Sequence, residues 1–169
     1  MPKFLKLSSG NITEEATVAA SAGAGDAGKV PQLDGAGRLD NSMMPNGIGA
    51  ESIVLPASEN LSAGDFVNIW SDAGTAKVRK ADATSISKKA DGFVTSAVVS
   101  GANATVYYGN RNEALAGLTI GSQYFLSDAA PGGVIDAPPA GSGKIVQKLG
   151  RAYGAAALLV EIEDAIILV

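Results

Sequence analysis

The large side chains of this chain are confined to its later part. Eight of the nine aromatic residues lie between Phe66 and Tyr153, and the first fifty residues contain only one, Phe4. A buried large side chain stabilises a core by roughly 1.5–3 kcal/mol, so a core needs several of them. We therefore predict two parts: an extended, Gly/Ala-rich arm over residues 1–50, and a folded domain over residues 51–169.

The composition excludes several kinds of chemistry. The chain has no cysteine and no histidine, which rules out disulfides, Ser–His–Asp triads, Cys–His pairs and most zinc sites. Its net charge is −4, and its few basic clusters stand beside aspartates, so we expect no nucleic-acid partner. No apolar run is long enough for a membrane span or a signal peptide. We expect synthesis in the cytoplasm, no membrane partner, no cofactor and no enzymatic activity.

The arm divides into three stretches. Ile12–Ala20 contains enough helix-forming residues for two helical turns, and Ser21–Gly28, SAGAGDAG, is typical of a flexible linker. From Lys29 onward, isolated apolar residues stand on a chain rich in Gly, Asp and Asn, which favour turns. Such a segment cannot by itself offset a backbone entropy of about 1–2 kcal/mol per residue, so we expect it to dock on another surface. The residues expected to make this contact are Lys29, Val30, Pro31, Leu33, Leu39, Met43, Met44, Pro45 and Ile48.

The folded part has the spacing of an all-β protein. Short runs of β-branched and aromatic residues recur about every eight to twelve positions, bounded by Gly, Pro, Asp or Ser. We predict a small β-sandwich or barrel, jelly-roll-like, with no long helix. The predicted strands are Ser52–Pro56, Phe66–Trp70, Ala76–Lys80, Gly92–Val99, Ala104–Tyr108, Gln123–Leu126, Gly133–Asp136, Lys144–Tyr153, Ala157–Glu161 and Ala165–Val169.

Three groups of residues match parts of chemical motifs. Gly23–Gly28 with Lys29 matches a phosphate-binding loop, but Val30-Pro31 stands where the loop needs Ser or Thr at the start of a helix. Asp34, Asp40 and Asn41 lack the alternate spacing of a calcium loop. Glu161 and Glu163 fit a carboxylate pair, but their spacing also suits the solvated face of a last strand, which is the interpretation we adopt. We expect none of the three to be a site.

The arm segment resembles a segment that recurs in bacteriophage virion proteins. The resemblance begins at Gly28-Lys29-Val30-Pro31, continues through Asp34, Arg38, Leu39 and Asp40, and ends at Met43-Met44-Pro45. The folded part is also similar to the small β domains that phages carry on capsids and fibres. The segments that carry this second similarity are Gly117–Thr119, Gln123–Leu126, Pro131–Gly133, Val146-Gln147, Gly150–Ala152 and Ile166–Val169.

The resemblance implies a capsid decoration (cement) or head-fibre protein, related through its arm to phage tail fibres. It implies binding to the phage major capsid protein through the arm, stabilisation of the shell, a homotrimer, and a place on the exterior of the virion. The chain lacks the long repetitive shaft of a tail fibre, which favours the head. The alternative is a tail-fibre or adhesin module in which Trp70, Tyr107 or Tyr108 contacts host surface glycans, since aromatic rings stack on sugars.

Overall fold

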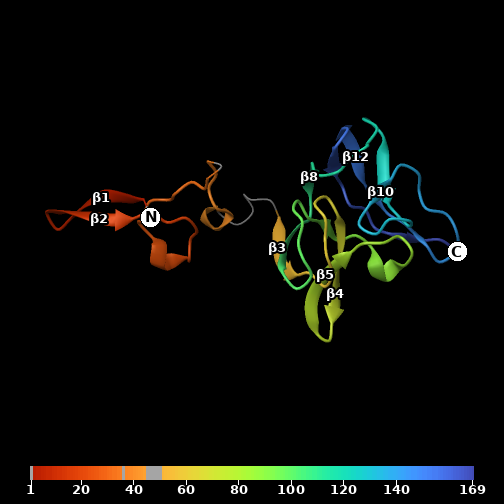
Figure 1. Ribbon diagram of the computed structural model, residues 1–169, viewed down its shortest axis with the longest axis horizontal. Helices are drawn as coiled ribbons and strands as arrows, with labels where there is room; N and C mark the ends of the chain where they lie inside the picture. Colours follow the sequence, from red (N-terminus) through yellow and green to blue (C-terminus); the bar gives the residue numbers. More distant parts are fainter. Residues whose placement is uncertain (1, 36, 45–50) are drawn as a thin grey trace. The chain divides into compact units, whose positions relative to one another are not determined.

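The computed structural model describes residues 2–35, 37–44 and 51–169 (Figure 1). The chain divides into two compact units, Met1–Gly49 and Ala50–Val169, and each is described by itself. Pro45 and Ile48, two of the predicted contact residues, lie outside the described residues. Within the described part of the chain, no helix is long and apolar enough to cross a membrane.

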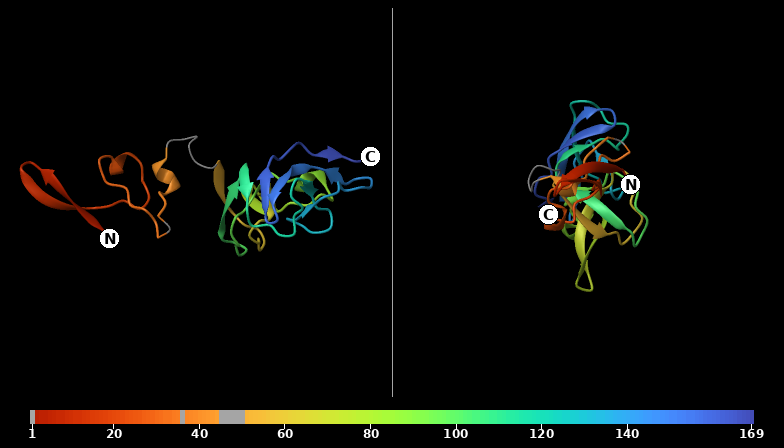
Figure 2. Two further views of the ribbon diagram at one scale, coloured as in Figure 1. Left: turned by 90° about the horizontal axis from the view of Figure 1, so that it is seen from above. Right: turned by 90° about the vertical axis from the view of Figure 1, so that its left-hand side faces the viewer.

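The first unit begins with a β-hairpin, drawn in red in Figures 1 and 2. Strands β1 (Lys3–Ser8) and β2 (Asn11–Ala16) are antiparallel, and two short 3-10 helices follow, η1 (Ala24–Asp26) and η2 (Asn41–Met43). The helical turns predicted for Ile12–Ala20 are therefore wrong. Ser9-Gly10 forms a two-residue turn that returns the chain onto β1, and the β-branched Ile12 and Thr13 suit a strand better than a helix.

The second unit contains two five-stranded antiparallel sheets, and each sheet takes its strands from one half of the unit. The first sheet has the order β3-β7-β6-β4-β5, and an isolated bridge between Ala57 and Val78 joins the end of β3 to β5, so the sheet curls on itself. Its strands are β3 (Ser52–Pro56), β4 (Phe66–Asp72), β5 (Thr75–Lys80), β6 (Gly92–Phe93) and β7 (Asn103–Tyr107), with the 3-10 helix η3 (Ile86–Lys88) between β5 and β6.

The second sheet has the order β10-β9-β12-β13-β8, and a separate pair is formed by β11 and β14. Figure 1 shows β8, β10 and β12 of this sheet beside the first sheet. The strands are β8 (Asn110–Asn112), β9 (Gln123–Leu126), β10 (Val134–Ile135), β11 (Ile145–Val146), β12 (Lys148–Gly154), β13 (Ala157–Val160) and β14 (Ile166–Ile167).

The first sheet contributes to apolar clusters on both faces. Neighbouring residues of a strand point to opposite sides, so Phe66 lies in one cluster and Val67 in the other. Phe66 and Phe93 pack into a cluster that also contains Leu126, Leu149 and Leu158 of the second half, so this cluster joins the two sheets. The other face of the first sheet lines a second cluster inside the curl of that sheet. Its members are Ala57, Leu61, Val67, Val78, Val94, Ala104 and Val106.

The prediction of an all-β domain is confirmed, whereas several strand limits differ. The predicted strand Gly92–Val99 ends at Phe93, because the Val94 backbone then bonds to Asp65 and Gly64 outside the ladder. The predicted strand Lys144–Tyr153 is divided into β11 and β12 at Gln147.

The strand is divided at Gln147 because the two parts have different partners: β11 pairs with β14, whereas β12 pairs with β9 and β13. The Gln147 side chain makes contacts outside both ladders. It is buried, accepts a hydrogen bond from the Ala90 N–H at 2.7 Å, and donates to the Ala90 carbonyl at 2.9 Å and the Glu163 carbonyl at 3.0 Å. Ala90 lies just before β6 of the first sheet. A buried amide that satisfies two backbone groups of another segment fixes that segment in place, so Gln147 connects the two halves of the domain.

Candidate functional site

The candidate site is the part of the arm that follows the hairpin, over residues 17–44, and it contains most of the predicted contact residues. Its first loop closes where Val18 pairs with Pro31 in an isolated parallel bridge. The Val18 N–H donates to the Val30 carbonyl at 3.0 Å, and the Gln32 N–H donates to the Val18 carbonyl at 2.8 Å. The Thr17 hydroxyl also donates to the Gln32 side chain at 2.8 Å. These bonds hold residues 18–32 as a closed loop.

The predicted flexible linker lies inside this loop and has a defined conformation. Lys29 Nζ lies 2.8 Å from Asp26 Oδ1, and the Ala22 N–H donates to Asp26 Oδ2 at 2.7 Å. The hydrogen bond from Lys29, together with that from Ala22, lowers the pKa of Asp26 below its ordinary value, and the same contact raises the pKa of Lys29. The helix at the phosphate-loop match is a single 3-10 turn of three residues, Ala24–Asp26. The segment predicted to be a flexible linker thus contains a 3-10 turn and hydrogen bonds of its own.

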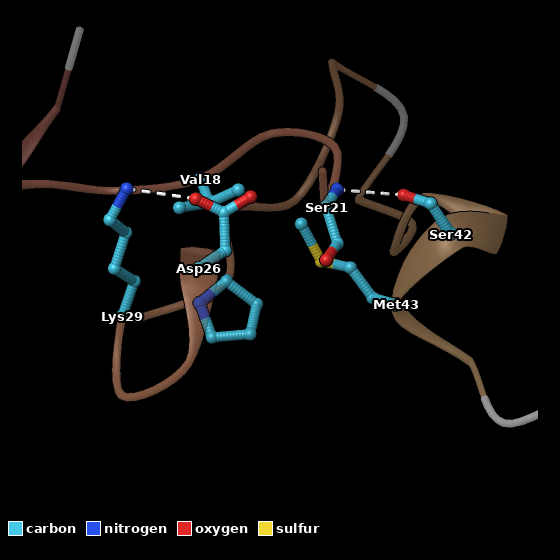
Figure 3. Close-up of a pocket in the computed structure, with 7 residues that line it drawn as sticks. Val18, Ser21, Asp26, Lys29, Ser42 and Met43 are labelled. Atoms are coloured by element: carbon cyan, nitrogen blue, oxygen red, sulfur yellow. Dashed lines mark hydrogen bonds and ion pairs between the residues drawn. The ribbon is translucent and has the colours of Figure 1, made fainter. Parts of the chain in front are cut away.

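A shallow pocket of about 220 Å³ lies within the first unit (Figure 3). One wall comes from the closed loop and the other from η2, and the Ser21 N–H donates to the Ser42 hydroxyl at 2.7 Å between them. The structure thus brings three of the predicted contact residues to one pocket. The lining residues are Val18, Ser21, Asp26, Lys29, Pro31, Ser42 and Met43.

A second turn carries Leu33 and Leu39. Arg38 donates to Asp34 Oδ2 through Nε at 3.2 Å and Nη2 at 3.1 Å, and its backbone N–H donates to Asp34 Oδ1 at 2.9 Å. Asp40 accepts from both the hydroxyl and the N–H of Ser42, and these bonds lower the pKa of Asp40. Asp34 and Asp40 thus each shape their own turn. Among the described residues no group of three or more acidic side chains is placed to hold a metal ion.

Most predicted contact residues expose their apolar side chains. Val30, Leu33 and Leu39 are 42%, 54% and 47% exposed. Met44 is also exposed, whereas Met43 is half-buried in the pocket wall. These exposed apolar side chains are available for a partner to cover.

The acidic residues near the C-terminus do not lie on a strand. β13 ends at Val160 and β14 begins at Ile166, so Glu161 and Glu163 fall in the connection between them. Both carboxylates approach Lys148 Nζ, at 3.9 Å for Glu161 and 2.5 Å for Glu163. The predicted acidic strand face is therefore wrong, and the two residues form an ion-pair cluster around one lysine.

Two of the three aromatic residues considered for glycan stacking have a ring engaged by the protein. Arg79 lies 4.8 Å above the ring of Trp70, whose indole N–H donates to Ser58 at 3.2 Å. Tyr107 packs against Phe93 with 5.8 Å between ring centroids. Tyr108 is 37% exposed, and burial of the rest of its side chain raises the pKa of its hydroxyl. A stacking platform of several aromatic rings is not assembled by these three residues.

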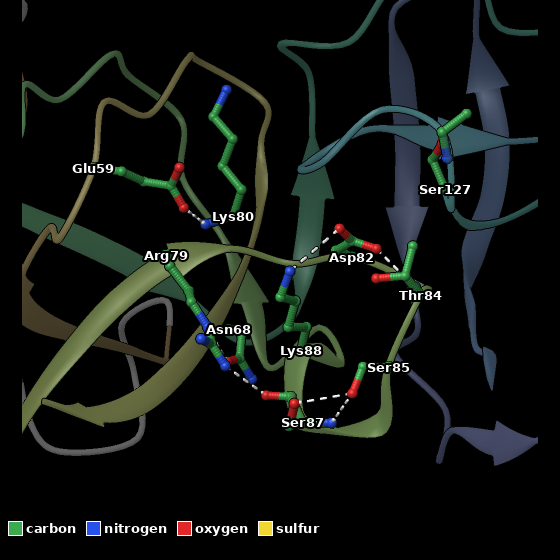
Figure 4. A network of polar contacts seen from close by, with 11 residues as sticks. Glu59, Asn68, Arg79, Lys80, Asp82, Thr84, Ser85, Ser87, Lys88 and Ser127 are labelled. Carbon is green, nitrogen blue, oxygen red and sulfur yellow. Dashed lines mark hydrogen bonds and ion pairs between the residues drawn. The ribbon is translucent and has the colours of Figure 1, made fainter. Parts of the chain in front are cut away.

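The basic residues of β5 and η3 are paired within the domain, as Figure 4 shows for part of them. Arg79 donates to the Asn68 side chain at 3.0 Å and to the Ser87 carbonyl at 2.8 Å. The lysines of this region each lie within ion-pair distance of an aspartate. The pairs are Lys77–Asp72 at 2.6 Å, Lys80–Asp65 at 3.2 Å, Lys88–Asp82 at 3.7 Å and Lys89–Asp91 at 3.7 Å.

The fold and the arm together define a class of protein: a small two-sheet β domain that carries an N-terminal segment with exposed apolar residues. No family model and no curated protein sequence matches the chain. Among solved structures, the chain is similar to the N base of head fibre gp8.5 from bacteriophage phi29, with a TM-score of 0.45 and 16% sequence identity. The similarity covers 67% of this chain and 95% of the phi29 chain.

Proposed function

We propose that this chain is a bacteriophage virion structural protein, a capsid decoration or head-fibre protein that binds the shell of major capsid protein through its arm and stabilises it. The observation that carries the proposal is the exposure of Leu33 and Leu39 on a turn that the Asp34–Arg38 contact holds in shape. The resemblance of residues 28–45 to a segment of phage virion proteins supports the same assignment.

A turn that is already shaped is suited to docking. Ordering the backbone of one residue costs about 1–2 kcal/mol, and a turn that is formed before binding avoids much of that cost. Leu33 and Leu39 are each about half exposed, so covering them at an interface yields on the order of 1 kcal/mol per side chain. The shell would supply an apolar groove that accepts both leucines.

The remaining parts of the proposal concern place and assembly. The folded unit, residues 50–169, would stand on the exterior of the capsid, and three copies would assemble around a symmetry axis of the shell. The protein would be made in the host cytoplasm and would bind neither nucleic acid nor membrane. Its net charge of −4 supports the exclusion of nucleic acid, because DNA-binding surfaces are basic.

The experiment is a binding assay with purified shells that lack the protein. The full chain and the variant Leu33→Ser/Leu39→Ser are sedimented with shells over a range of concentrations. Loss of about 2 kcal/mol of apolar burial should weaken binding by about 10- to 30-fold. Ile120→Ser is the matched control, because Ile120 is 68% exposed but lies in the second unit. Equal binding by the double variant and the control would contradict the proposed role of the arm.

A further inference from the structure

Among the described residues, nothing covers the face of the N-terminal hairpin that carries Leu5, Leu7 and Ile12 or pairs with its two outer strand edges. Its turn residues, Ser9 and Gly10, have φ values of 52° and 83°, which is the type I′ geometry that matches the twist of a two-residue hairpin. Ser8 faces Asn11 across the turn. In such a hairpin this first pair is hydrogen-bonded and the pairs then alternate. The bond from the Thr17 N–H to the Pro2 carbonyl, 3.1 Å, continues that alternation at the open end.

The alternation decides which residues face outward. Leu5, Leu7 and Ile12 belong to the non-hydrogen-bonded pairs, so their backbone N–H and C=O groups point away from the hairpin, and their side chains share one face. The three side chains are 71%, 72% and 72% exposed. Among the residues that the structure describes, none hydrogen-bonds to these outer backbone groups. Each edge is therefore open to a further strand, with apolar side chains ready to be covered.

The two edges carry opposite charge. β1 contributes Lys3 and Lys6, and β2 contributes Glu14 and Glu15. Within the hairpin these residues form two cross-strand ion pairs, Lys3–Glu14 at 2.7 Å and Lys6–Glu15 at 3.0 Å. A strand that pairs with the outer edge of β1 must be acidic, and a strand that pairs with the outer edge of β2 must be basic. The hairpin itself contains one strand of each kind.

We propose that the hairpins of neighbouring copies of this chain join edge to edge, with β1 of one copy antiparallel to β2 of the next. This pairing sets lysines beside glutamates, whereas β1 against β1 or β2 against β2 sets like charges together, which is destabilising. The contact uses a different patch on each copy, and such a contact forms a ring where the rotation between successive copies closes, which is the arrangement proposed here. The ring buries Leu5, Leu7 and Ile12 on its inner face. It also adds the strands that a two-stranded sheet needs, since an isolated hairpin is only marginally stable in water.

The contact is separate from the segment proposed to bind the shell, because it uses only residues 3–16. The two proposals can therefore fail independently: a chain whose hairpin does not associate can still bind shells through Leu33 and Leu39. The hairpin contact should weaken as the ionic strength rises, because exposed ion pairs are screened by salt.

The test measures the mass of the full chain by light scattering at several concentrations, without shells. The wild-type chain should associate reversibly into a closed oligomer. Lys3→Glu/Lys6→Glu makes both edges acidic, and Glu14→Lys/Glu15→Lys makes both edges basic, so each variant alone should lose at least tenfold in association constant. A mixture of the two variants should associate more strongly than either variant alone, because every contact between unlike variants sets an acidic edge beside a basic one. The quadruple variant, in which the two edges exchange their charges, should associate as the wild type does.

The mixture separates contacts between copies from contacts within one hairpin. If the substitutions acted only by breaking the ion pairs inside each hairpin, mixing the two variants would restore nothing, and the proposal would be overturned. A wild-type chain that stays monomeric at all concentrations, or variants that associate like the wild type, would overturn it as well. Asp72→Lys/Lys77→Glu is the matched control, because it reverses an ion pair of 2.6 Å between β4 and β5 and should leave association unchanged.

Discussion

Asp26 and Asp40 each hold a turn of the arm through hydrogen bonds to their carboxylates. Asp26 accepts from Lys29 Nζ and the Ala22 N–H, and Asp40 accepts twice from Ser42. Both sets of hydrogen bonds favour the ionised carboxylate and so lower the pKa of the carboxyl group below its ordinary value of 3.8. A lowered pKa in the folded state stabilises the turn above pH 3.8, and this stabilisation is lost as the pH falls through the lowered pKa.

At the residue scale, the Asp26 contact can be tested through its titration. Carboxyl carbon NMR of the full chain should give Asp26 a midpoint below 3.8, and Lys29→Ala should move that midpoint upward, because the hydrogen bond from Lys29 is the largest cause of the shift. Lys3→Ala is the control, since Lys3 pairs with Glu14 and does not contact Asp26. An Asp26 midpoint that is the same in Lys29→Ala and the wild type would show that the contact is absent in solution.

At the scale of the element, β12 depends on Gly150. The register of β12 shifts between Lys148 and Gly150 where it pairs with β9, and Gly150 has a φ of 151°. A Cβ at this position would overlap the Leu159 carbonyl of β13. Gly150→Ala should therefore lower the free energy of unfolding by about 2–4 kcal/mol, from backbone strain and overpacking together.

Urea denaturation checks this value. The control is Gly109→Ala, since a Cβ at Gly109 meets nothing within 4 Å and its φ is not positive. It should change the free energy of unfolding by less than about 1 kcal/mol. Midpoints that shift equally in the two variants would mean that β12 has room for a side chain at its bulge.

Element by element, the sequence predicted best the strands that contain runs of β-branched and aromatic residues. β3, β4, β5, β7 and β9 match predicted runs to within two residues, and this holds for β3 even though its Ile53 and Val54 are exposed. The hairpin at residues 3–16 escaped prediction, since Leu5, Leu7 and Ile12 are exposed and no core pattern marks them. The available signal was the Ser9-Gly10 dipeptide between two short runs. β8 was missed because Asn110–Asn112 contains no apolar residue.

The candidate site could be predicted only as a list of exposed apolar residues. The ion pairs that shape it, Lys29–Asp26 and Arg38–Asp34, join residues three and four apart, and nothing in the sequence distinguishes them from unpaired surface charges. The pocket depends on the hydrogen bond between Ser21 and Ser42, which are twenty-one residues apart. Predicting this contact requires knowledge of how the chain folds back on itself. Residue type therefore indicated which apolar side chains of the arm are exposed. The shape of the pocket depends on contacts between residues distant in sequence, which residue type does not reveal.

At the scale of the whole molecule, the second unit should fold without the first. Both apolar clusters consist of residues between positions 55 and 165. A chain of residues 50–169 should therefore unfold cooperatively in urea with a midpoint like that of the same unit in the full chain. Tryptophan fluorescence follows this transition, because Trp70 lies in the second unit. A non-cooperative transition of the shortened chain would mean that the arm contributes to the core.

The division of the two sheets between successive halves of the second unit sets an order of events on the ribosome. Every strand of the first sheet, residues 52–107, is synthesised before any strand of the second sheet. The cluster inside the curl of the first sheet involves only residues 55–106, so the nascent chain has everything it needs to form that cluster early. The face with Phe66 and Phe93 then remains bare until Leu126, Leu149 and Leu158 have emerged. During that interval the partly synthesised protein exposes this apolar face to chaperones and to other nascent chains.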